Sequence, residues 1–241
     1  MVAILTDVGK SRSLNEDFAS YIEKDDYGIY VVADGMGGHN AGEVASRMAS
    51  VGIVEYVYNH FNDIDKNKLL RRAVKKVNTD IFNNSRESER LNGMGTTITA
   101  CMTFEDKIQI ANVGDSSCFG IKDNYIVKLT KDHSLVQELL DAGSISEQQA
   151  SKHPKKNIIT RAVGTSSHVD VDIFQMDKDE FDIYMLCTDG LTNELSKKEI
   201  LEIVHKSSDL DEACNKLVEL AKYRGGKDNI TVLLFGGEKI W

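Results

Sequence analysis

Acidic residues beside glycine or asparagine, near the ends of expected strands, are the part of this sequence best suited to chemistry. Glycine at such places lets the backbone and a ligand approach closely. A cluster of oxygen ligands suits hard cations such as Mg²⁺ or Mn²⁺ better than zinc. Two such ions that share a carboxylate can hold a hydroxide at neutral pH and bind a phosphate. The acids occur at five places: Asn15-Glu16-Asp17, Asp34-Gly35, Gly114-Asp115, Asp189-Gly190 and Asp228-Asn229.

Each pair also has a plainer interpretation, because Asp-Gly is a common turn. An isolated pair is more often a turn than a ligand. Five such places in 241 residues are harder to explain as turns alone. Two of them, at Asp34 and Asp189, follow similar apolar strands that we expect to end there. The residues by themselves leave a metal site and a set of turns about equally supported.

Several other chemistries lack their motif. Gly226-Lys227 is followed by Asp228, and the first glycine of a P-loop is missing. The glycines after Asp34 approach a dinucleotide-binding pattern, but Asn40 occupies its last position. No His-Glu-x-x-His and no Gly-x-Ser-x-Gly is present. The four cysteines form no Cys-x-x-Cys pair, so we expect reduced, buried thiols in a cytosolic protein.

The elements that position these acids follow hydrophobic periodicity, which is two residues in strands and 3.6 in helices. We expect strands over 2–8, 18–22, 28–33, 96–104, 107–113, 117–122, 125–129, 173–176, 182–188 and 229–235. We expect helices over 41–52, 69–82, 134–142, 146–152, 197–205 and 210–223. The four strands between 96 and 129 read as an antiparallel meander.

This order favours an α+β fold, with helices packed on the outer faces of antiparallel sheets. No linker, repeat or charge block divides the chain, so we expect a single domain over 1–241. The stretch from about 134 to 165 is the expected insertion.

Composition excludes some partners. Lys and Arg total 29 and Asp and Glu total 38, for a net charge of −9. So acidic a chain is a poor candidate for binding nucleic acid or an anionic membrane. No apolar run approaches 18 residues, and the first residues lack the features of a signal peptide, so we expect a cytoplasmic protein.

Eight motifs in order resemble the metal-dependent protein phosphatases of type 2C, the PPM family. The resemblance covers essentially the whole chain, and 34–39 and 132–164 are most similar to the stand-alone bacterial serine/threonine phosphatases. The motifs are Arg12-x-x-Asn15-Glu16-Asp17, Asp34-Gly35-Met36-Gly37-Gly38-His39, Gly95-Thr96-Thr97, Asn112-Val113-Gly114-Asp115-Ser116, Leu129-Thr130-Lys131-Asp132-His133-Ser134, Ile159-Thr160-Arg161-Ala162-Val163-Gly164, Thr188-Asp189-Gly190-Leu191 and Gly226-Lys227-Asp228-Asn229-Ile230-Thr231.

The resemblance implies a four-layer α/β/β/α sandwich with a metal site at one edge and a flap within 134–165. It implies two Mn²⁺ or Mg²⁺ ions. Asp34 would bridge both ions, and the carbonyl of Gly35 would bind one of them. Asp189 and Asp228 would complete the shell of the other.

Other acids have weaker implied roles. Glu16 would act mostly through metal-bound water, and Asp17 through water or hydrogen bonds behind the ligands. A third, weaker metal would lie between Asp115 and Asp189. Arg12 would grip the phosphate oxygens through its planar fork.

The implied reaction is a single in-line displacement of phosphoserine or phosphothreonine by a metal-bridging hydroxide. His39 is a weak candidate to protonate the leaving group, because animal members carry a histidine where this chain has Met36. Metal-bound water could serve instead. His133 is better explained as a hydrogen-bonded loop anchor.

The implied partners are phosphoproteins and a eukaryote-like bacterial Ser/Thr kinase that the enzyme opposes, with the chain a monomer. Basic residues in the flap, Lys152, His153, Lys155, Lys156 and Arg161, suggest a receiver for acidic phosphopeptides, and a solvated loop face is equally supported. Two other functions stay open. One is a binding module that keeps the fold without catalysis, and the other is a two-metal hydrolase of small phosphate esters or nucleotides.

Overall fold

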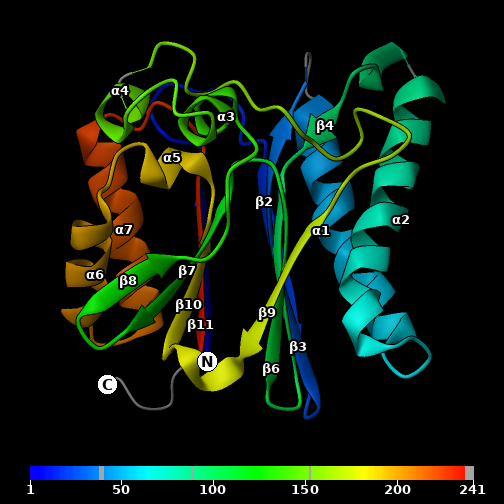
Figure 1. The fold of residues 1–241 in the computed structure, drawn as a ribbon, viewed down its shortest axis with the longest axis horizontal. Coiled ribbons are helices and arrows are strands. Elements are labelled where there is room, and N and C mark those ends of the chain that lie inside the picture. Colours follow the sequence, from blue (N-terminus) through cyan, green and yellow to red (C-terminus); the bar gives the residue numbers. More distant parts are fainter. Residues whose placement is uncertain (38–40, 88, 152, 237–241) are drawn as a thin grey trace.

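Two antiparallel sheets lie face to face in the computed structural model, which describes residues 1–37, 41–87, 89–151 and 153–236. A pair of helices covers the outer face of each sheet (Figure 1). The predicted α+β sandwich is therefore confirmed. Within the described ranges, no helix has both the length and the apolar character needed to cross a bilayer.

The β11 sheet joins both ends of the described chain. Its order is β1 (Val2–Asp7), β11 (Ile230–Gly236), β10 (Ile183–Cys187), β7 (Ser117–Lys122) and β8 (Tyr125–Lys128). The helices α6 (Lys197–His205) and α7 (Leu210–Arg224) pack on its outer face with buried side chains such as Ile200 and Leu217.

The β3 sheet carries the other helix pair. Its order is β2 (Asp17–Glu23), β3 (Tyr27–Met36), β5 (Ile98–Phe104), β6 (Lys107–Val113) and β9 (Asp172–Asp177), and the short β4 (Gly95–Thr96) also pairs with β3. The helices α1 (Ala41–His60) and α2 (Lys66–Glu87) cover it. The small buried residues Ala41, Ala45 and Ala49 line the core side of α1, which lets this helix lie close to the sheet.

The core between the sheets follows from the two-residue period of the strands. In β3, Ile29 and Val31 face the helices, whereas Tyr30 and Val32 face the opposite sheet. Tyr30 stacks on Phe235 of β11 with a centroid separation of 3.7 Å. The four cysteines are free and buried, as predicted.

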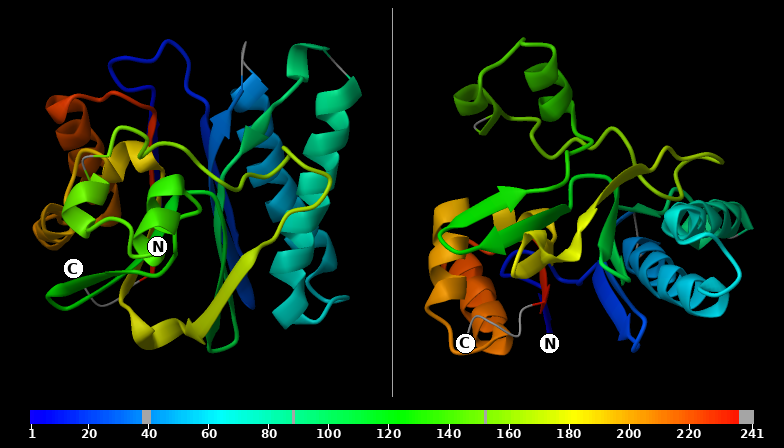
Figure 2. Two further views of the ribbon diagram at one scale, coloured as in Figure 1. Left: turned by 45° about the horizontal axis from the view of Figure 1, so that its top comes forward. Right: turned by 60° about the horizontal axis from the view of Figure 1, so that its bottom comes forward.

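Most of the segment from 134 to 165 lies outside the four layers (Figure 2), but near its end Val163 bridges to Thr96 of β4 and is buried in the core. The segment contains α3 (Leu135–Asp141), capped by the side chain of Ser134, and α4 (Glu147–Ser151). An isolated bridge between Ser134 and Ile159 joins the two ends of this segment. The remaining short helices are η1 (Glu89–Leu91), η2 (Lys178–Glu180) and α5 (Asp189–Thr192).

Three local predictions were wrong. Strand β3 does not stop at Asp34-Gly35 but runs on to Met36, because Gly35 and Met36 pair with β4. The strand expected over 96–104 is divided at Thr97 into β4 and β5. The expected meander is split, because β5 and β6 belong to one sheet whereas β7 and β8 belong to the other. Periodicity cannot show this change of sheet at Gly114-Asp115.

Candidate metal centre

The five acidic places lie together at one edge of the sandwich, where strands of both sheets begin or end. Asp17 opens β2 and pairs in register with Asp34 near the end of β3. Asp115 follows β6, Asp189 opens α5 just after β10, and Asp228 precedes β11. They enclose a cavity of about 280 Å³. Its lining includes Arg12, Glu16, Asp34, Gly35, Met36, Asp115, Ile159, Asp189 and Asp228.

Backbone hydrogen bonds hold Asp34 in place. Its N–H donates to Thr97 Oγ1 at 2.9 Å, and its carbonyl accepts from Thr97 N–H and Thr96 Oγ1. Its side chain lies among other acids. Burial, followed by the charges of Asp17 and Asp189, raises the pKa of Asp34 well above its ordinary value. A group in this position gains strongly from a cation.

Gly35 occupies a place where no side chain fits. A Cβ atom there would overlap the carbonyl group of Gly42 at the start of α1 and the carbonyl oxygen of Glu16. The N–H of Gly35 donates to that Glu16 oxygen at 3.0 Å. Glycine is therefore required by the close approach of β3, the 8–16 loop and α1.

Asp17 joins the two sheets through its carboxylate. Oδ2 accepts from Thr188 Oγ1 at 2.8 Å and from Thr231 Oγ1 at 2.7 Å, both in or next to the β11 sheet. Oδ1 is buried and has no hydrogen-bond partner among the described residues. Burial raises the pKa of Asp17 to about 7, although the two threonine bonds act in the opposite direction.

Asp189 and Asp115 both line this cavity. Asp189 Oδ2 accepts from Asn193 at 2.9 Å, while Oδ1 is buried without a partner in the described part of the chain. Burial and then the charge of Asp228 raise the pKa of Asp189 to about 6. Burial and then the charge of Asp189 raise the pKa of Asp115 to about 7.

Arg12 lies at the rim, in the loop between β1 and β2. Its guanidinium contacts Asp228 twice, with Nε 3.0 Å from Oδ1 and NH2 3.0 Å from Oδ2. The hydrogen bond to Asp228 is the main cause that raises the pKa of Arg12. About half of the Arg12 side chain remains exposed, at 48%.

Glu16 and Asn229 tie this loop to the last strand. Asn229 Oδ1 accepts from Glu16 N–H at 2.8 Å, and its Nδ2 donates to the carbonyls of Val8 and Leu14. The Glu16 carboxylate accepts from the N–H of Gly42. Burial, the largest contribution, raises the pKa of Glu16.

The residues fit a hard dication by donor chemistry. All the donors are oxygens, and two buried carboxylate oxygens, on Asp17 and Asp189, have no partner among the residues described. In those same residues no three His, Cys, Asp or Glu side chains converge as a finished ligand set. The two-point contact of Arg12 engages Asp228, which is one of the predicted ligands.

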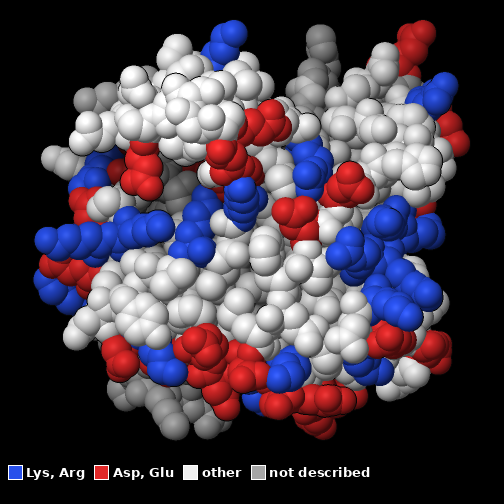
Figure 3. All heavy atoms as spheres, in the orientation of Figure 1, with Lys and Arg blue, Asp and Glu red and all other residues white. Residues whose placement is uncertain are grey.

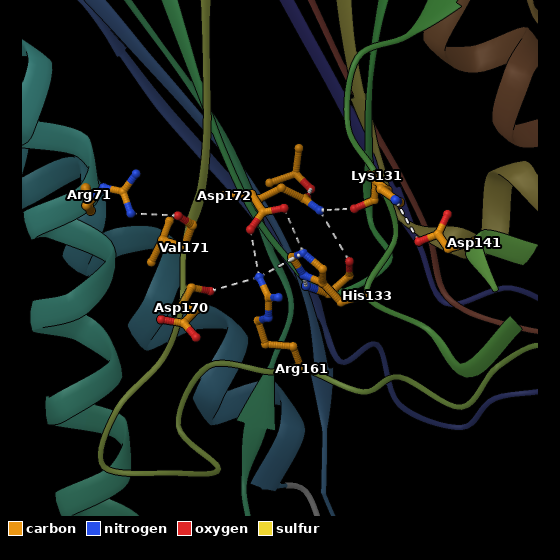
Figure 4. Close-up of polar contacts among 11 residues, drawn as sticks. Arg71, Lys131, His133, Asp141, Arg161, Asp170, Val171 and Asp172 are labelled. Atoms are coloured by element: carbon orange, nitrogen blue, oxygen red, sulfur yellow. Dashed lines mark hydrogen bonds and ion pairs between the residues drawn. The ribbon is translucent and has the colours of Figure 1, made fainter. Parts of the chain in front are cut away.

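His133 is a buried loop anchor, which confirms the structural interpretation of this residue. Its Nδ1 accepts from Gly114 N–H at 3.0 Å, and Nε2 lies 3.2 Å from Asp172 Oδ2 (Figure 4). The backbone N–H of His133 donates to the Gly114 carbonyl at 2.9 Å. His133 thus holds both polar backbone groups of the residue that precedes Asp115.

Two of the basic flap residues have partners outside the flap. Arg161 donates to Asp172 Oδ1 at 2.8 Å and to the Asp170 carbonyl (Figure 4). Lys156 reaches Asn193 Oδ1 at 2.7 Å, beside Asp189. The expectation that Arg161 adds to a basic flap surface was wrong, because β9 supplies its partner. Lys152 and His39 lie outside the described residues.

Four residues at this edge were given no role by the sequence: Thr188, Asn193, Asn229 and Thr231. Thr188 and Thr231 hold Asp17, whereas Asn193 and Asn229 hold Asp189 and the Arg12 loop. Each stands within four residues of a predicted metal ligand, and Thr188, Asn229 and Thr231 also belong to the motifs that carry the family resemblance. Nothing in the sequence shows which groups their side chains contact.

Comparison with known proteins gives consistent matches. The family model described as Protein phosphatase 2C matches residues 9–223. The serine/threonine phosphatase stp of Listeria monocytogenes is 41% identical over 234 residues, which are 95% of this chain and 92% of that protein.

Solved structures of bacterial phosphatases are also similar to this chain. The crystal structure of Stp1 from Staphylococcus aureus has a TM-score of 0.91 and 34% identity, and covers 98% of this chain and 94% of that one. The catalytic domain of PstP, in complex with 2 manganese ions, has a TM-score of 0.84 and 32% identity, over 97% and 96% of the two chains.

The fold, the acidic edge and these matches define the class of protein, which is a protein phosphatase. More specifically, the chain belongs to the protein phosphatase 2C family, whose members depend on metal ions. It is a serine/threonine phosphatase of the bacterial type.

Proposed function

We propose that this enzyme hydrolyses phosphoserine and phosphothreonine in proteins by a single displacement at phosphorus, without a phosphoenzyme. The observation that carries the proposal is the cavity at the sandwich edge, lined by Asp34, Asp115, Asp189 and Asp228 with Arg12 at its rim. Three of these acids, Asp34, Asp115 and Asp189, have raised pKa values, and such a set beside one arginine suits a metal-assisted reaction on a phosphate. The bacterial phosphatases that resemble the chain support it.

Asp34, Gly35, Asp189 and Asp228 would hold two Mn²⁺ or Mg²⁺ ions, with Glu16 and Asp17 behind them. Asp115, with Asp189, would hold a third ion. When bound, such ions make hydroxide available at neutral pH and neutralise charge on the phosphate. The unpartnered buried oxygens of Asp17 and Asp189 support this assignment. The manganese complex of the related PstP domain is consistent with it.

The protein's own residues supply binding and orientation. Arg12 presents a planar fork that fits two phosphate oxygens. To do so it exchanges Asp228 for the phosphate, so substrate binding and the release of Asp228 occur together. Thr188 and Thr231 keep Asp17 ionisable by donating to it. The leaving serine or threonine oxygen needs a proton, and His39 is a weak candidate donor.

The setting proposed for the enzyme is the cytoplasm, where it would act as a monomer against a eukaryote-like Ser/Thr kinase. The catalytic unit would be one domain over 1–241, with 134–165 as its flap. Its similarity to stand-alone bacterial phosphatases along nearly the whole chain supports these points.

The direct test is phosphate release from a phosphothreonine peptide with Mn²⁺, with Mg²⁺ and with chelator. We expect metal-dependent release that Asp189→Asn reduces by at least 10²-fold. Asp211→Asn is the matched control, because Asp211 is an exposed acid on α7. If folded wild-type protein releases no phosphate with either metal, the result favours a binding module without catalysis. The next experiment would then be to capture its binding partner. Faster release from mononucleotides than from the peptide would instead favour a small-ester hydrolase.

A further inference from the structure

Helix α2 presents a basic face on an acidic protein. Between Asp65 and Asp80 the sequence has no acidic residue. The core side of α2 buries Leu69, Leu70, Ala73, Val74, Val77 and Ile81. The opposite side exposes five cations, which we call the α2 basic surface: Lys68, Arg71, Arg72, Lys75 and Lys76. It forms the blue area over α2 at the right of Figure 3.

Most of the charge on this surface is not neutralised by neighbours. Lys76 pairs with Asp80 at 2.6 Å, and Lys68 lies 3.7 Å from Asp65. Arg71 donates to a carbonyl oxygen, that of Val171, rather than to a carboxylate. Within the described residues, Arg72 and Lys75 make no ion pair. Exposed like charges on successive turns repel one another, so an anionic partner relieves this repulsion.

The α2 basic surface lies within reach of the proposed active site. Ile159 lines the cavity, and five residues further on the N–H of Gly164 donates to Asn78 Oδ1 of α2 at 2.8 Å. Five residues span at most about 17 Å. Along the axis of α2, Lys75 lies about 5 Å from Asn78 and Arg71 about 10 Å from it. The surface therefore begins within roughly 25 Å of the cavity, a distance that an extended peptide covers in about seven residues.

We propose that the α2 basic surface docks an acidic segment of the protein substrate, about six to ten residues from the phosphorylated side chain. This inference rests on the proposed phosphatase function. It adds a substrate class: phosphoproteins with a cluster of Glu or Asp at that spacing. The surface contributes affinity for the substrate and takes no part in the displacement at phosphorus.

The size and setting of the surface favour a protein segment over other polyanions. From Lys68 to Lys76 it is about 12 Å long, which matches four residues of extended chain. A membrane or a nucleic acid would bring a wide anionic field toward a protein of net charge −9. A short acidic segment meets only the local positive potential.

The experiment compares phosphothreonine peptides that differ at four positions. Two peptides carry Glu-Glu-Glu-Glu eight residues before or after the phosphothreonine, and their partners carry Gln at the same four positions. The enzymes are wild type, Arg72→Glu/Lys75→Glu, and the control Lys197→Glu/Lys198→Glu, which places the same charge change on exposed α6 residues. Each pair is measured with Mn²⁺ at 50 mM and 500 mM NaCl.

For one of the two placements we expect wild-type kcat/KM to be about five- to tenfold higher for the Glu peptide, through a lower KM. The ratio of kcat/KM for the Glu peptide to kcat/KM for the Gln peptide should fall to one or below in Arg72→Glu/Lys75→Glu, while kcat/KM for the Gln peptide stays unchanged. The α6 control should keep the wild-type ratio. High salt should remove it. These results would support the inference.

Four results would overturn it. An active wild type with no preference for Glu at either placement, or a preference that Arg72→Glu/Lys75→Glu retains, refutes the docking surface and leaves the phosphatase function intact. A wild type inactive on every peptide refutes the proposed function as well. Co-sedimentation with phosphatidylserine vesicles that depends on Arg72 and Lys75, without a peptide preference, assigns the surface to a membrane instead.

Discussion

Arg12 and Asp228 form a two-point ion pair across 216 residues of sequence, with both contacts at 3.0 Å. The pair brings the loop after the first strand onto the residue before the last one. It also joins a proposed phosphate ligand to a proposed metal ligand. In the proposed roles, a metal ion that binds Asp228 would compete with the guanidinium, and a phosphate that binds the same Nε and NH2 groups of Arg12 would release Asp228.

This competition predicts opposite effects of one substitution. In Arg12→Ala, loss of a cation beside the acids should tighten Mn²⁺ binding about three- to tenfold. The same change should lower kcat/KM for a phosphothreonine peptide about 10²-fold, because the phosphate loses the hydrogen bonds from the guanidinium group. Titration calorimetry and steady-state kinetics measure the two effects. Arg12→Lys, which keeps the charge, should lose activity without the gain in Mn²⁺ affinity. Weaker Mn²⁺ binding by Arg12→Ala would mean that Arg12 supports the ligands.

Metal-free stability should depend on pH in a defined direction. Asp17, Asp115 and Asp189 have folded-state pKa values raised to about 7, 7 and 6, above about 3.9 in the unfolded chain. Their contribution to stability is therefore fully present below pH 4 and is lost as pH rises through 6 to 7. We expect the melting temperature in chelator to fall between pH 5 and pH 8, and Mn²⁺ to reverse the fall at pH 8.

Asp115→Asn tests the cause of that dependence. It removes one charge from the acidic edge at nearly constant volume. At pH 8 in chelator it should raise the melting temperature by several degrees, which corresponds to about 1–3 kcal/mol. A lower melting temperature at pH 8 would show that the ionised form of Asp115 has a stabilising partner.

Gly35 should not tolerate a methyl group. In Gly35→Ala the Cβ would overlap backbone atoms of Gly42 and Glu16, neither of which can move without shifting α1 or the Arg12 loop. We expect a loss of about 3 kcal/mol or more in urea unfolding. The control is Gly93→Ala, where the Cβ meets open space and the cost is limited to the positive φ of 75°, about 1 kcal/mol. Equal losses in the two variants would contradict the packing argument.

The two ring nitrogens of His133 can be tested separately. In His133→Asn the side-chain oxygen lies near the position of Nδ1 and can still accept from the N–H of Gly114. In His133→Gln the side-chain amide lies nearer to the position of Nε2 and to Asp172. We expect His133→Ala to cost about 2–3 kcal/mol and His133→Asn to recover more of it than His133→Gln, by urea unfolding. The reverse order would place the main contact at Asp172.

Much of the fold could be predicted from the sequence because periodicity reports local structure directly. The stripe of Leu69, Ala73 and Val77 predicted α2, and Ser134 predicted the start of α3. Sheet membership could not be predicted, since β6 and β7 are adjacent in sequence and lie in different sheets. The extension of β3 through Gly35 was missed because its partner, β4, is two residues long.

The acids of the candidate site were recognised because each stands beside a glycine, an asparagine or a strand end. What could not be predicted is which contacts they make before a metal binds. The Arg12–Asp228 pair and the threonine contacts of Asp17 join residues more than 170 positions apart. The role of Arg161 was misjudged for a different reason, because its partner Asp172, only 11 residues away, comes from β9 rather than from the flap.

The pairing of β1 has a consequence for how the enzyme is made. In the β11 sheet, β1 is an edge strand whose one neighbour is β11, the last strand of the described chain. On the ribosome, the first strand must therefore wait for more than two hundred further residues before it finds its partner. The loop that carries Arg12 and Glu16 also cannot reach its final position earlier, because Asn229, directly before β11, holds that loop. A nascent chain thus cannot complete the proposed active site until β11 has been synthesised.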